Sequence, residues 1–107
     1  MFETIDATEL RRRLDGACPP RIVDVRTAPE VARGTITGAT HIELSTLPAR
    51  HPELDRDSPV VFICQSGARS GQACAYLAQR GFTHACNLAG GIAGWMSAGM
   101  PLSELDR

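Results

Sequence analysis

The chain has 107 residues, a formal net charge of -1 and an ordinary globular composition, with 43% hydrophobic residues. This length predicts one domain over residues 1–107, because it leaves no room for two cores of useful size. The near-neutral charge argues against nucleic acid or an anionic membrane as a partner. Every basic residue is arginine, so a phosphate-binding loop of the Walker type, which needs a lysine, is excluded.

The amino-terminal half begins with a short strand, ETI, and continues into a helix that Asp6 and Glu9 start in a capping-box-like pattern. The segment RIVDVR alternates and is rich in β-branched residues, which is typical of a buried strand. Pro29 suits a first helical turn. The expected elements are a strand over 3–5, a helix over 7–14, a strand over 21–26, a turn or short helix over 27–31 and a strand over 40–44.

The carboxy-terminal half contains PVVFIC, a nearly apolar run that predicts a central strand covered on both faces. The segment SGQACAYLAQR collects apolar residues on one side and ends at Gly81, so it predicts a helix. A last helix is expected to stop at Gly99 and Pro101. The expected elements are a strand over 59–64, a helix over 70–80, a strand over 84–88 and a helix over 91–99.

Strands that alternate with helices predict an α/β fold, with a central, mainly parallel sheet of about five strands covered by helices on both faces. No expected helix has the length of a membrane span, and the segment MFETIDATELRRRL lacks the apolar core of a signal peptide. We therefore expect a cytoplasmic protein. Its four cysteines show no C-x-x-C spacing and no clustering with histidines, so no metal, no cofactor and no disulfide is expected.

The stretch FICQSGARSGQ places a thiol where the most apolar strand stops and a helix begins. Sites in open α/β sheets form beyond the carboxyl ends of the strands, and Cys64 lies there. The small residues Ser66, Gly67 and Ala68 let the backbone point N–H groups inward, which makes an anion cradle with the helix amino terminus. Together with the charge of Arg69, these donors lower the pKa of a thiol, so Cys64 is predicted to be a nucleophile rather than a buried structural cysteine.

The loop CQSGARS resembles the active-site loop of the rhodanese family, the single-domain sulfurtransferases. The segment IVDVRTAPEVARGTITGATHIEL resembles the amino-terminal signature of that family, and NLAGGIAGWMSAGMPL resembles its carboxy-terminal signature. The three segments occur in the expected order between Arg21 and Leu102. One departure is Thr35, where many members carry histidine; because this position lies outside the loop, we expect little effect on the chemistry.

The resemblance implies a rhodanese-like fold and a thiosulfate sulfurtransferase-like enzyme. It would move a sulfane sulfur from thiosulfate, or from a polysulfide or persulfide donor, to a thiol or cyanide acceptor through a persulfide on Cys64. Arg69 would attract the anionic donor, and Asp24 and Arg26 would support the loop. A protein that delivers or accepts sulfur is left open as a partner. The residues that the resemblance assigns to substrate binding are Gln65, Ser66, Gly67, Ala68 and Ser70.

Two other kinds of function stay open. Some rhodanese-like domains lack the cysteine and serve as binding or regulatory modules, but this chain keeps Cys64 and the whole loop. A sulfur carrier of the same fold, which would use the cysteine, is also left open. A phosphatase-like or arsenate-reductase-like enzyme would have five residues between its cysteine and arginine, whereas four separate Cys64 from Arg69. The smaller ring of amides suits one sulfur atom. A dithiol redox enzyme is disfavoured by the missing C-x-x-C.

Residues outside the loop receive structural interpretations. Glu30 could pair with an arginine or cap the short helix, but a solvated surface role is favoured. Gly90 and Gly91 are expected to form a tight turn near the loop. Residues 45–57 are expected to border the pocket. The arginines at 11–13 are expected on a solvated helix face. The remaining expectations are a packing role for Trp95, burial for Cys74 and Cys86, and exposure for Cys18.

Overall fold

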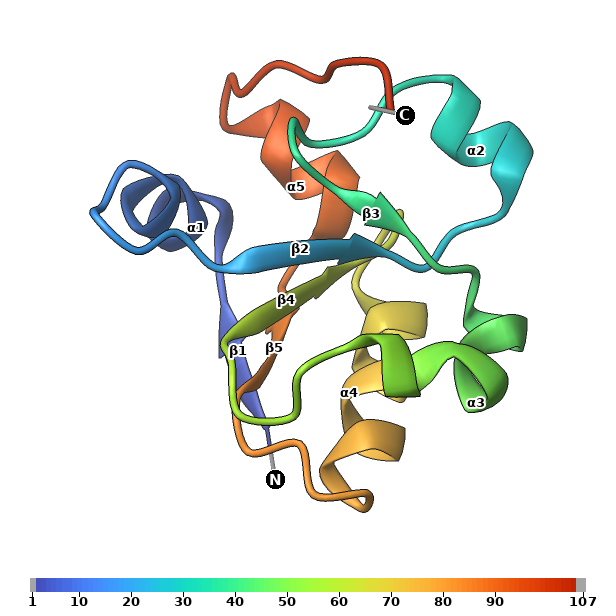
Figure 1. Cartoon of the computed structure of the whole chain (residues 1–107). Helices are drawn as coiled ribbons and strands as arrows, with labels where there is room; N and C mark the ends of the chain where they lie inside the picture. The colour runs from blue at the N-terminus through green and yellow to red at the C-terminus, as the bar shows by residue number, and fades with distance from the viewer. Residues whose placement is uncertain (1, 106–107) are drawn as a thin grey trace.

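The computed structural model describes residues 2–105 and confirms the α/β class. Five parallel strands form one sheet in the order β1-β5-β4-β2-β3, with helices on both faces (Figure 1). Among residues 2–105, no helix is long and apolar enough to cross a membrane. The elements are β1 Glu3–Ile5, α1 Ala7–Leu14, β2 Arg21–Asp24, α2 Ala28–Ala32, β3 Thr40–His41, a 3-10 turn Leu44–Thr46, α3 Leu47–Arg50, a 3-10 turn His51–Glu53, β4 Val60–Ile63, α4 Ala68–Ala78, β5 Ala85–Leu88 and α5 Gly91–Ser97.

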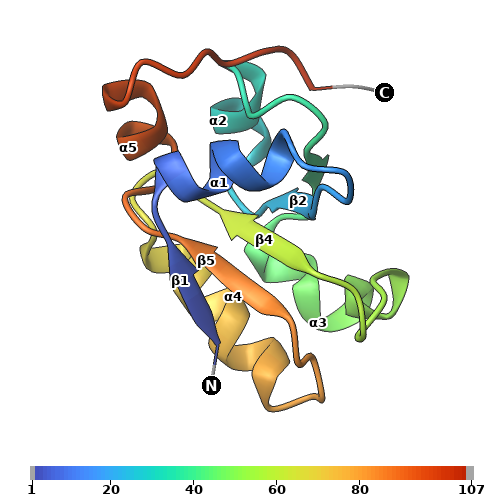
Figure 2. The ribbon, with the colours of Figure 1, turned by 90° about the vertical axis from the view of Figure 1, so that its left-hand side faces the viewer.

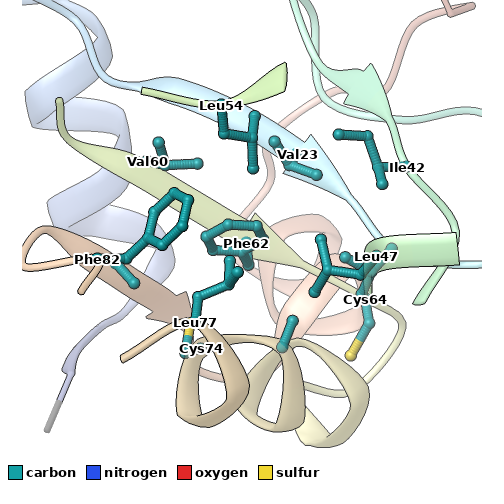
Figure 3. Close-up of a cluster of buried hydrophobic side chains, with 13 residues drawn as sticks. Val23, Ile42, Leu47, Leu54, Val60, Phe62, Cys64, Cys74, Leu77 and Phe82 are labelled. Carbon is teal, nitrogen blue, oxygen red and sulfur yellow. The ribbon is translucent and has the colours of Figure 1, made fainter. Parts of the chain in front are cut away.

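The strand β4 contributes side chains to two hydrophobic cores, one on each face of the sheet. All four of its residues are buried, and alternate side chains enter opposite cores. Val60 and Phe62 pack in the cluster between the sheet and helices α3 and α4. Val61 and Ile63 pack in the cluster between the sheet and helices α1 and α5. Figure 2 shows α1 and α5 above the strands and α3 and α4 below them. Figure 3 shows Phe62 inside the first cluster, with Cys64 at the end of the same strand.

Several boundaries differ from those the sequence predicts. The strand expected over 40–44 is only Thr40–His41, because the chain turns into a 3-10 segment at Leu44. The helix expected from 70 begins at Ala68, since Gly67 adopts a φ of +102° and its carbonyl accepts from Gly71 N in the first turn at 3.0 Å. Arg69 therefore lies in the first turn of α4.

The helix α3 and the 3-10 turns beside it were not predicted from the sequence. Each of the segments Leu47–Arg50 and His51–Glu53 is a single turn and carries proline near its start. Such short elements have too few residues for a helical period to show. They are held by tertiary packing, because Leu47 and Leu54 are both buried in the cluster against α4.

Candidate active site

Cys64 follows β4 directly and is 1% exposed, between the sheet and the amino terminus of α4. Its Sγ accepts a hydrogen bond from Gly67 N at 3.0 Å and lies 3.3 Å from Ser70 Oγ. The left-handed conformation of Gly67 turns the backbone so that its N–H faces the sulfur. The predicted anion cradle is therefore formed around the Cys64 sulfur itself.

The cradle also sets the protonation of the thiol. Burial by itself raises the pKa of Cys64, but hydrogen bonds from the Ser70 hydroxyl and from the N–H groups of Ser70, Gly67 and Ser66 outweigh it and lower that pKa below its ordinary value. Hydrogen bonds to sulfur favour the charged form because they replace the water that burial removes. The arrangement therefore favours the thiolate, which is the nucleophilic form of cysteine.

The turn before α5 holds the base of the loop. Ile92 N donates to the carbonyl of Cys64 at 2.8 Å, and Ala93 N donates to the carbonyl of Gln65 at 3.1 Å. Gly91 allows this approach, because a Cβ at its position would lie 2.4 Å from Cys64 O. The expected tight turn near the loop is confirmed. The first amides of α5 bind the loop through its carbonyls and so help to keep its N–H groups directed at the sulfur.

Asp24 and Arg26 form a buried ion pair at the end of β2, with Arg26 Nη2 2.8 Å from Asp24 Oδ2. The same guanidinium donates to the carbonyl of Gly34 at 2.7 Å and reaches Gln65 Oε1 at 3.4 Å. A buried charge needs such partners. The pair thus ties the end of β2 to the loop between α2 and β3 and to the first residue after Cys64.

Thr35 belongs to this buried network. Its Oγ1 donates to Asp24 Oδ2 at 2.8 Å, and its backbone pairs in both directions with Ser103, again at 2.8 Å. The position lies outside the active-site loop, as the sequence indicates. The hydroxyl nevertheless satisfies the carboxylate that holds Arg26, so Thr35 connects the carboxy-terminal segment to the support of the loop.

Arg69 pairs with Glu30 of α2, which is one of the two alternatives that the sequence left open for Glu30. Its Nη1 and Nη2 lie 2.7 Å from Glu30 Oε1 and Oε2, which is a two-armed ion pair. Glu30 Oε1 also accepts from the backbone and hydroxyl of Thr27, closing a capping box at α2. The expectation that Glu30 is a solvated surface residue is wrong: it joins α2 to the active-site helix. Hydrogen bonding from Arg69, against an opposing contribution from burial, holds the pKa of Glu30 well below its usual range.

Asn87 on β5 is a site residue that sequence reasoning missed. Its Oδ1 lies 2.5 Å from Ser70 Oγ, and its Nδ2 donates to the carbonyl of Gly67 at 3.1 Å. The signal was a polar residue, Asn87, between apolar residues in the predicted strand HACNL. Ala85, two residues earlier, faces the apolar cluster under α4, so a buried amide on the same face needs polar partners.

The other predicted loop residues differ in exposure. Gln65, Ser66 and Ala68 are exposed, and Ser70 is fully buried against the sulfur. A cavity of about 340 Å³ includes Gln65 and is lined otherwise by residues of β2, α2, α5 and the segments beside them. Residues 51–57 border a different cavity, of about 420 Å³, with Arg80 and Phe82. Cys64 lines neither of these two cavities, so the expectation that residues 45–57 border the substrate pocket stays a prediction.

The remaining cysteines occupy the expected places. Cys18 is exposed, whereas Cys74 and Cys86 are buried in opposite cores. Burial raises the pKa of Cys74 to about 12 and that of Cys86 to about 11, so both stay protonated at neutral pH. Among residues 2–105, no three side chains of the metal-binding types come together. Trp95 is buried under α1 and donates to the carbonyl of Pro101 at 2.9 Å, as a packing residue does.

The arginines at 11–13 lie on the outer side of α1 and pair with nearby carboxylates. Arg11 pairs with Asp15 at 2.7 Å and Arg12 with Glu9. Arg13 bridges Glu9 and Glu3 at 2.7 and 2.8 Å. Arg12 is exposed, as predicted for a solvated face, whereas Arg11 and Arg13 are half-buried and Arg11 lies over the ring of Trp95.

Comparison with known proteins identifies the class. The family model of the rhodanese-like domain matches residues 6–98. A sulfurtransferase of Allochromatium vinosum is 42% identical over 102 residues, 95% of this chain and 95% of that protein. The thiosulfate sulfurtransferase GlpE of Pseudomonas aeruginosa is 34% identical over 97 residues, 90% of this chain and 86% of that protein. The crystal structure of a rhodanese-like domain protein from Staphylococcus aureus has a TM-score of 0.88 at 31% identity, and the match covers 98% of this chain and 100% of that one.

The chain belongs to the rhodanese-like domain family, as the three sequence segments predicted. Its relatives place it among the rhodanese-type enzymes, whose function is sulfur transfer.

Proposed function

We propose that this protein transfers a sulfane sulfur from thiosulfate, or from a polysulfide or persulfide donor, to a thiol or cyanide through a persulfide on Cys64. The observation that carries the proposal is the set of donors around one sulfur atom. Gly67 N and Ser70 Oγ both lie within hydrogen-bond reach of Cys64 Sγ, at the carboxyl end of a buried strand. A sulfur atom so placed can act as a nucleophile and then hold a second sulfur.

In the first step, the Cys64 thiolate attacks the outer sulfur of thiosulfate. The new S–S bond forms as the S–S bond of thiosulfate breaks, and sulfite leaves with the bonding electron pair. The loop lowers the pKa of Cys64 despite burial and so favours the thiolate that attacks. The negative charge that entered with the thiolate then lies on the outer sulfur of the persulfide.

In the second step, an acceptor thiolate or cyanide attacks that outer sulfur, and Cys64 leaves as a thiolate. The loop amides support both steps, because fixed N–H donors stabilise anionic sulfur without having to reorganise. The exposed side chains of Gln65 and Ser66 stand at the entrance and are suited to contact the donor. A protein that delivers or accepts the sulfur would meet the same exposed surface.

For Arg69 we propose two connected roles. Its ion pair with Glu30 holds the start of α4 against α2, and its side chain remains about one-third exposed. The guanidinium has five N–H donors, so the contacts with Glu30 leave others for an anionic donor. Arg69 thus attracts thiosulfate while it keeps the loop in place.

A phosphatase-like function is the second candidate, since it too would use a cysteine and an arginine around an anion. Four residues separate Cys64 from Arg69. The short ring of amides leaves little room for a tetrahedral anion, and the residue before Cys64 is Ile63 rather than a histidine. These features favour sulfur over phosphate chemistry.

Mass spectrometry of the loaded protein tests the proposal. The reduced protein is incubated with excess thiosulfate, desalted and weighed intact; we expect a gain of one sulfur atom on the Cys64 peptide, which cyanide or a small thiol removes. Polysulfide is the second donor to be tried. Cys64→Ser should fold normally, gain no such sulfur and form no thiocyanate. Hydrolysis of an aryl phosphate without loading by either donor would replace the sulfurtransferase proposal with the phosphatase one.

A further inference from the structure

Ser70 faces two acceptors with a single hydroxyl hydrogen. Its Oγ lies 3.3 Å from Cys64 Sγ and 2.5 Å from Asn87 Oδ1, and both are hydrogen-bond distances because sulfur is the larger atom. Ser70 is fully buried and Cys64 is 1% exposed, so water has little access to supply a second donor. The hydroxyl can therefore donate to only one of the two acceptors at a time.

The orientation of the Asn87 amide is determined by its other partner. Asn87 Nδ2 lies 3.1 Å from the carbonyl oxygen of Gly67, and only the NH₂ group can donate to a carbonyl. Turning the amide over would place two oxygens in contact there and would leave the NH₂ group facing Ser70. Oδ1 must therefore face Ser70, where it accepts the hydroxyl hydrogen.

We propose that Asn87 is a positioning residue that competes with the Cys64 sulfur for the Ser70 hydrogen and so sets the balance between thiol and thiolate. In the thiol, Ser70 donates to Asn87 Oδ1 and can accept from the Cys64 S–H. When Cys64 loses its proton to solvent, Ser70 keeps its own proton and turns it toward Sγ, leaving Asn87 Oδ1 without a donor. That loss opposes formation of the thiolate.

The same competition has a consequence in catalysis that rests on the proposed function. After the persulfide forms, the charge lies on the outer sulfur and Sγ is a neutral divalent atom. The Ser70 hydrogen can then return to Asn87, which restores the buried hydrogen bond. Asn87 would thus raise the free energy of the free thiolate relative to the persulfide, and it would favour loading of Cys64 over its reversal.

The charged groups nearest to Cys64 remain the same whatever occupies position 87. Arg69 on α4 is paired with Glu30 on α2, and Arg26 at the end of β2 is paired with Asp24. The α5 turn presents backbone amides to the loop carbonyls. A change in the titration of Cys64 caused by replacing Asn87 with an uncharged residue therefore reports hydrogen bonding and not a lost charge.

The pH profile of Cys64 alkylation by iodoacetamide, read on the Cys64 peptide by mass, tests the proposal without any sulfur donor. Asn87→Leu and Asn87→Ala both remove the competing acceptor, one filling its space and the other emptying it. In either variant the alkylation midpoint should move to lower pH, with alkylation at least about twofold faster on the acid side. In a Ser70→Ala background the same substitutions should have no such effect, because the hydrogen in question is absent.

Cys86→Ala is the matched control. Cys86 lies on the face of β5 opposite to Asn87, so this substitution should leave the pH profile of Cys64 alkylation unchanged. Thermal unfolding identifies which variants are folded. One folded Asn87 variant is enough to carry out the alkylation test. A midpoint that stays or rises, or one that falls equally in the Ser70→Ala background, would overturn the proposal. Failure of thiosulfate to load Cys64 would contradict the proposed function and leave this alkylation result intact.

Discussion

Arg69 and Glu30 join the active-site helix to α2 through two hydrogen bonds of 2.7 Å each. The two residues are 39 positions apart in the chain and come together because β2 and β4 are neighbouring parallel strands. The arginine of the loop is therefore already engaged by a carboxylate in the resting protein. Any role for its charge in donor binding operates together with its role in holding α4 against α2.

Replacing Arg69 by lysine should impair activity even though the charge is kept. One ammonium group cannot form both parallel hydrogen bonds to Glu30 and still contact a donor. We expect kcat/KM for thiosulfate to fall at least about tenfold, or ~1.4 kcal/mol of transition-state stabilisation. The exposed Arg12→Lys on α1 is the control and should behave as wild type. Wild-type kinetics for Arg69→Lys would mean that neither the two parallel hydrogen bonds to Glu30 nor the position of the guanidinium matters for activity.

Thr35→Val should weaken the support of the loop without changing the shape of the core. The substitution removes one donor to Asp24 Oδ2, in a carboxylate that is fully buried. Asp24 Oδ2 keeps Arg26 Nη2 as a donor at 2.8 Å, so the loss is that of one hydrogen bond to a buried charged group. We expect the free energy of unfolding in urea to fall by about 1.5–3 kcal/mol. Thr37→Val removes an exposed hydroxyl–hydroxyl contact with Ser103 and should change stability far less. Equal effects in the two variants would contradict the importance of the buried network.

Gly91→Ala should displace the active-site loop. The new Cβ would lie 2.4 Å from Cys64 O and 2.7 Å from the Gln65 carbonyl, in backbone that cannot move aside without shifting the loop. Both the melting temperature and kcat/KM should therefore fall. Gly99→Ala also strains a positive φ, of +85°, but meets no atom within 4 Å. It should cost about 1–2 kcal/mol of stability and leave kcat/KM unchanged. If Gly99→Ala lost activity to the same degree as Gly91→Ala, backbone strain alone would explain the loss of activity in both variants.

The triple variant of Cys18, Cys74 and Cys86 to serine should still turn over thiosulfate. None of the three is among the groups that contact the Cys64 sulfur, and the raised pKa of Cys74 and Cys86 keeps them protonated at neutral pH. Stability should fall by about 1–3 kcal/mol for each buried thiol that becomes a hydroxyl. Activity measured per folded molecule is the decisive quantity. Its loss, followed by recovery when one cysteine is restored, would indicate a resolving thiol instead.

The sequence by itself determined the class of the fold and the place of the proposed nucleophile, Cys64. An apolar strand ending at Cys64, a loop of small residues and a following helix are local patterns, and local patterns are visible in a linear sequence. The same holds for the Asp6 cap of α1, where Glu9 N donates to Asp6 Oδ1 at 2.8 Å. The short elements at 44–53 could not be predicted from the sequence, because a single turn is too short to show a helical period of apolar residues.

Only the tertiary structure decided which distant residues support the loop around the Cys64 sulfur. Glu30 reaches Arg69, Asn87 reaches Ser70, and Gly91 packs on the Cys64 carbonyl, over separations of 39, 17 and 27 positions. The physical reason is the crossover topology: parallel strands place their carboxyl ends at one edge, in the spatial order β1-β5-β4-β2-β3 rather than the chain order. Composition and spacing identify the groups that can react, but this spatial order selects their partners.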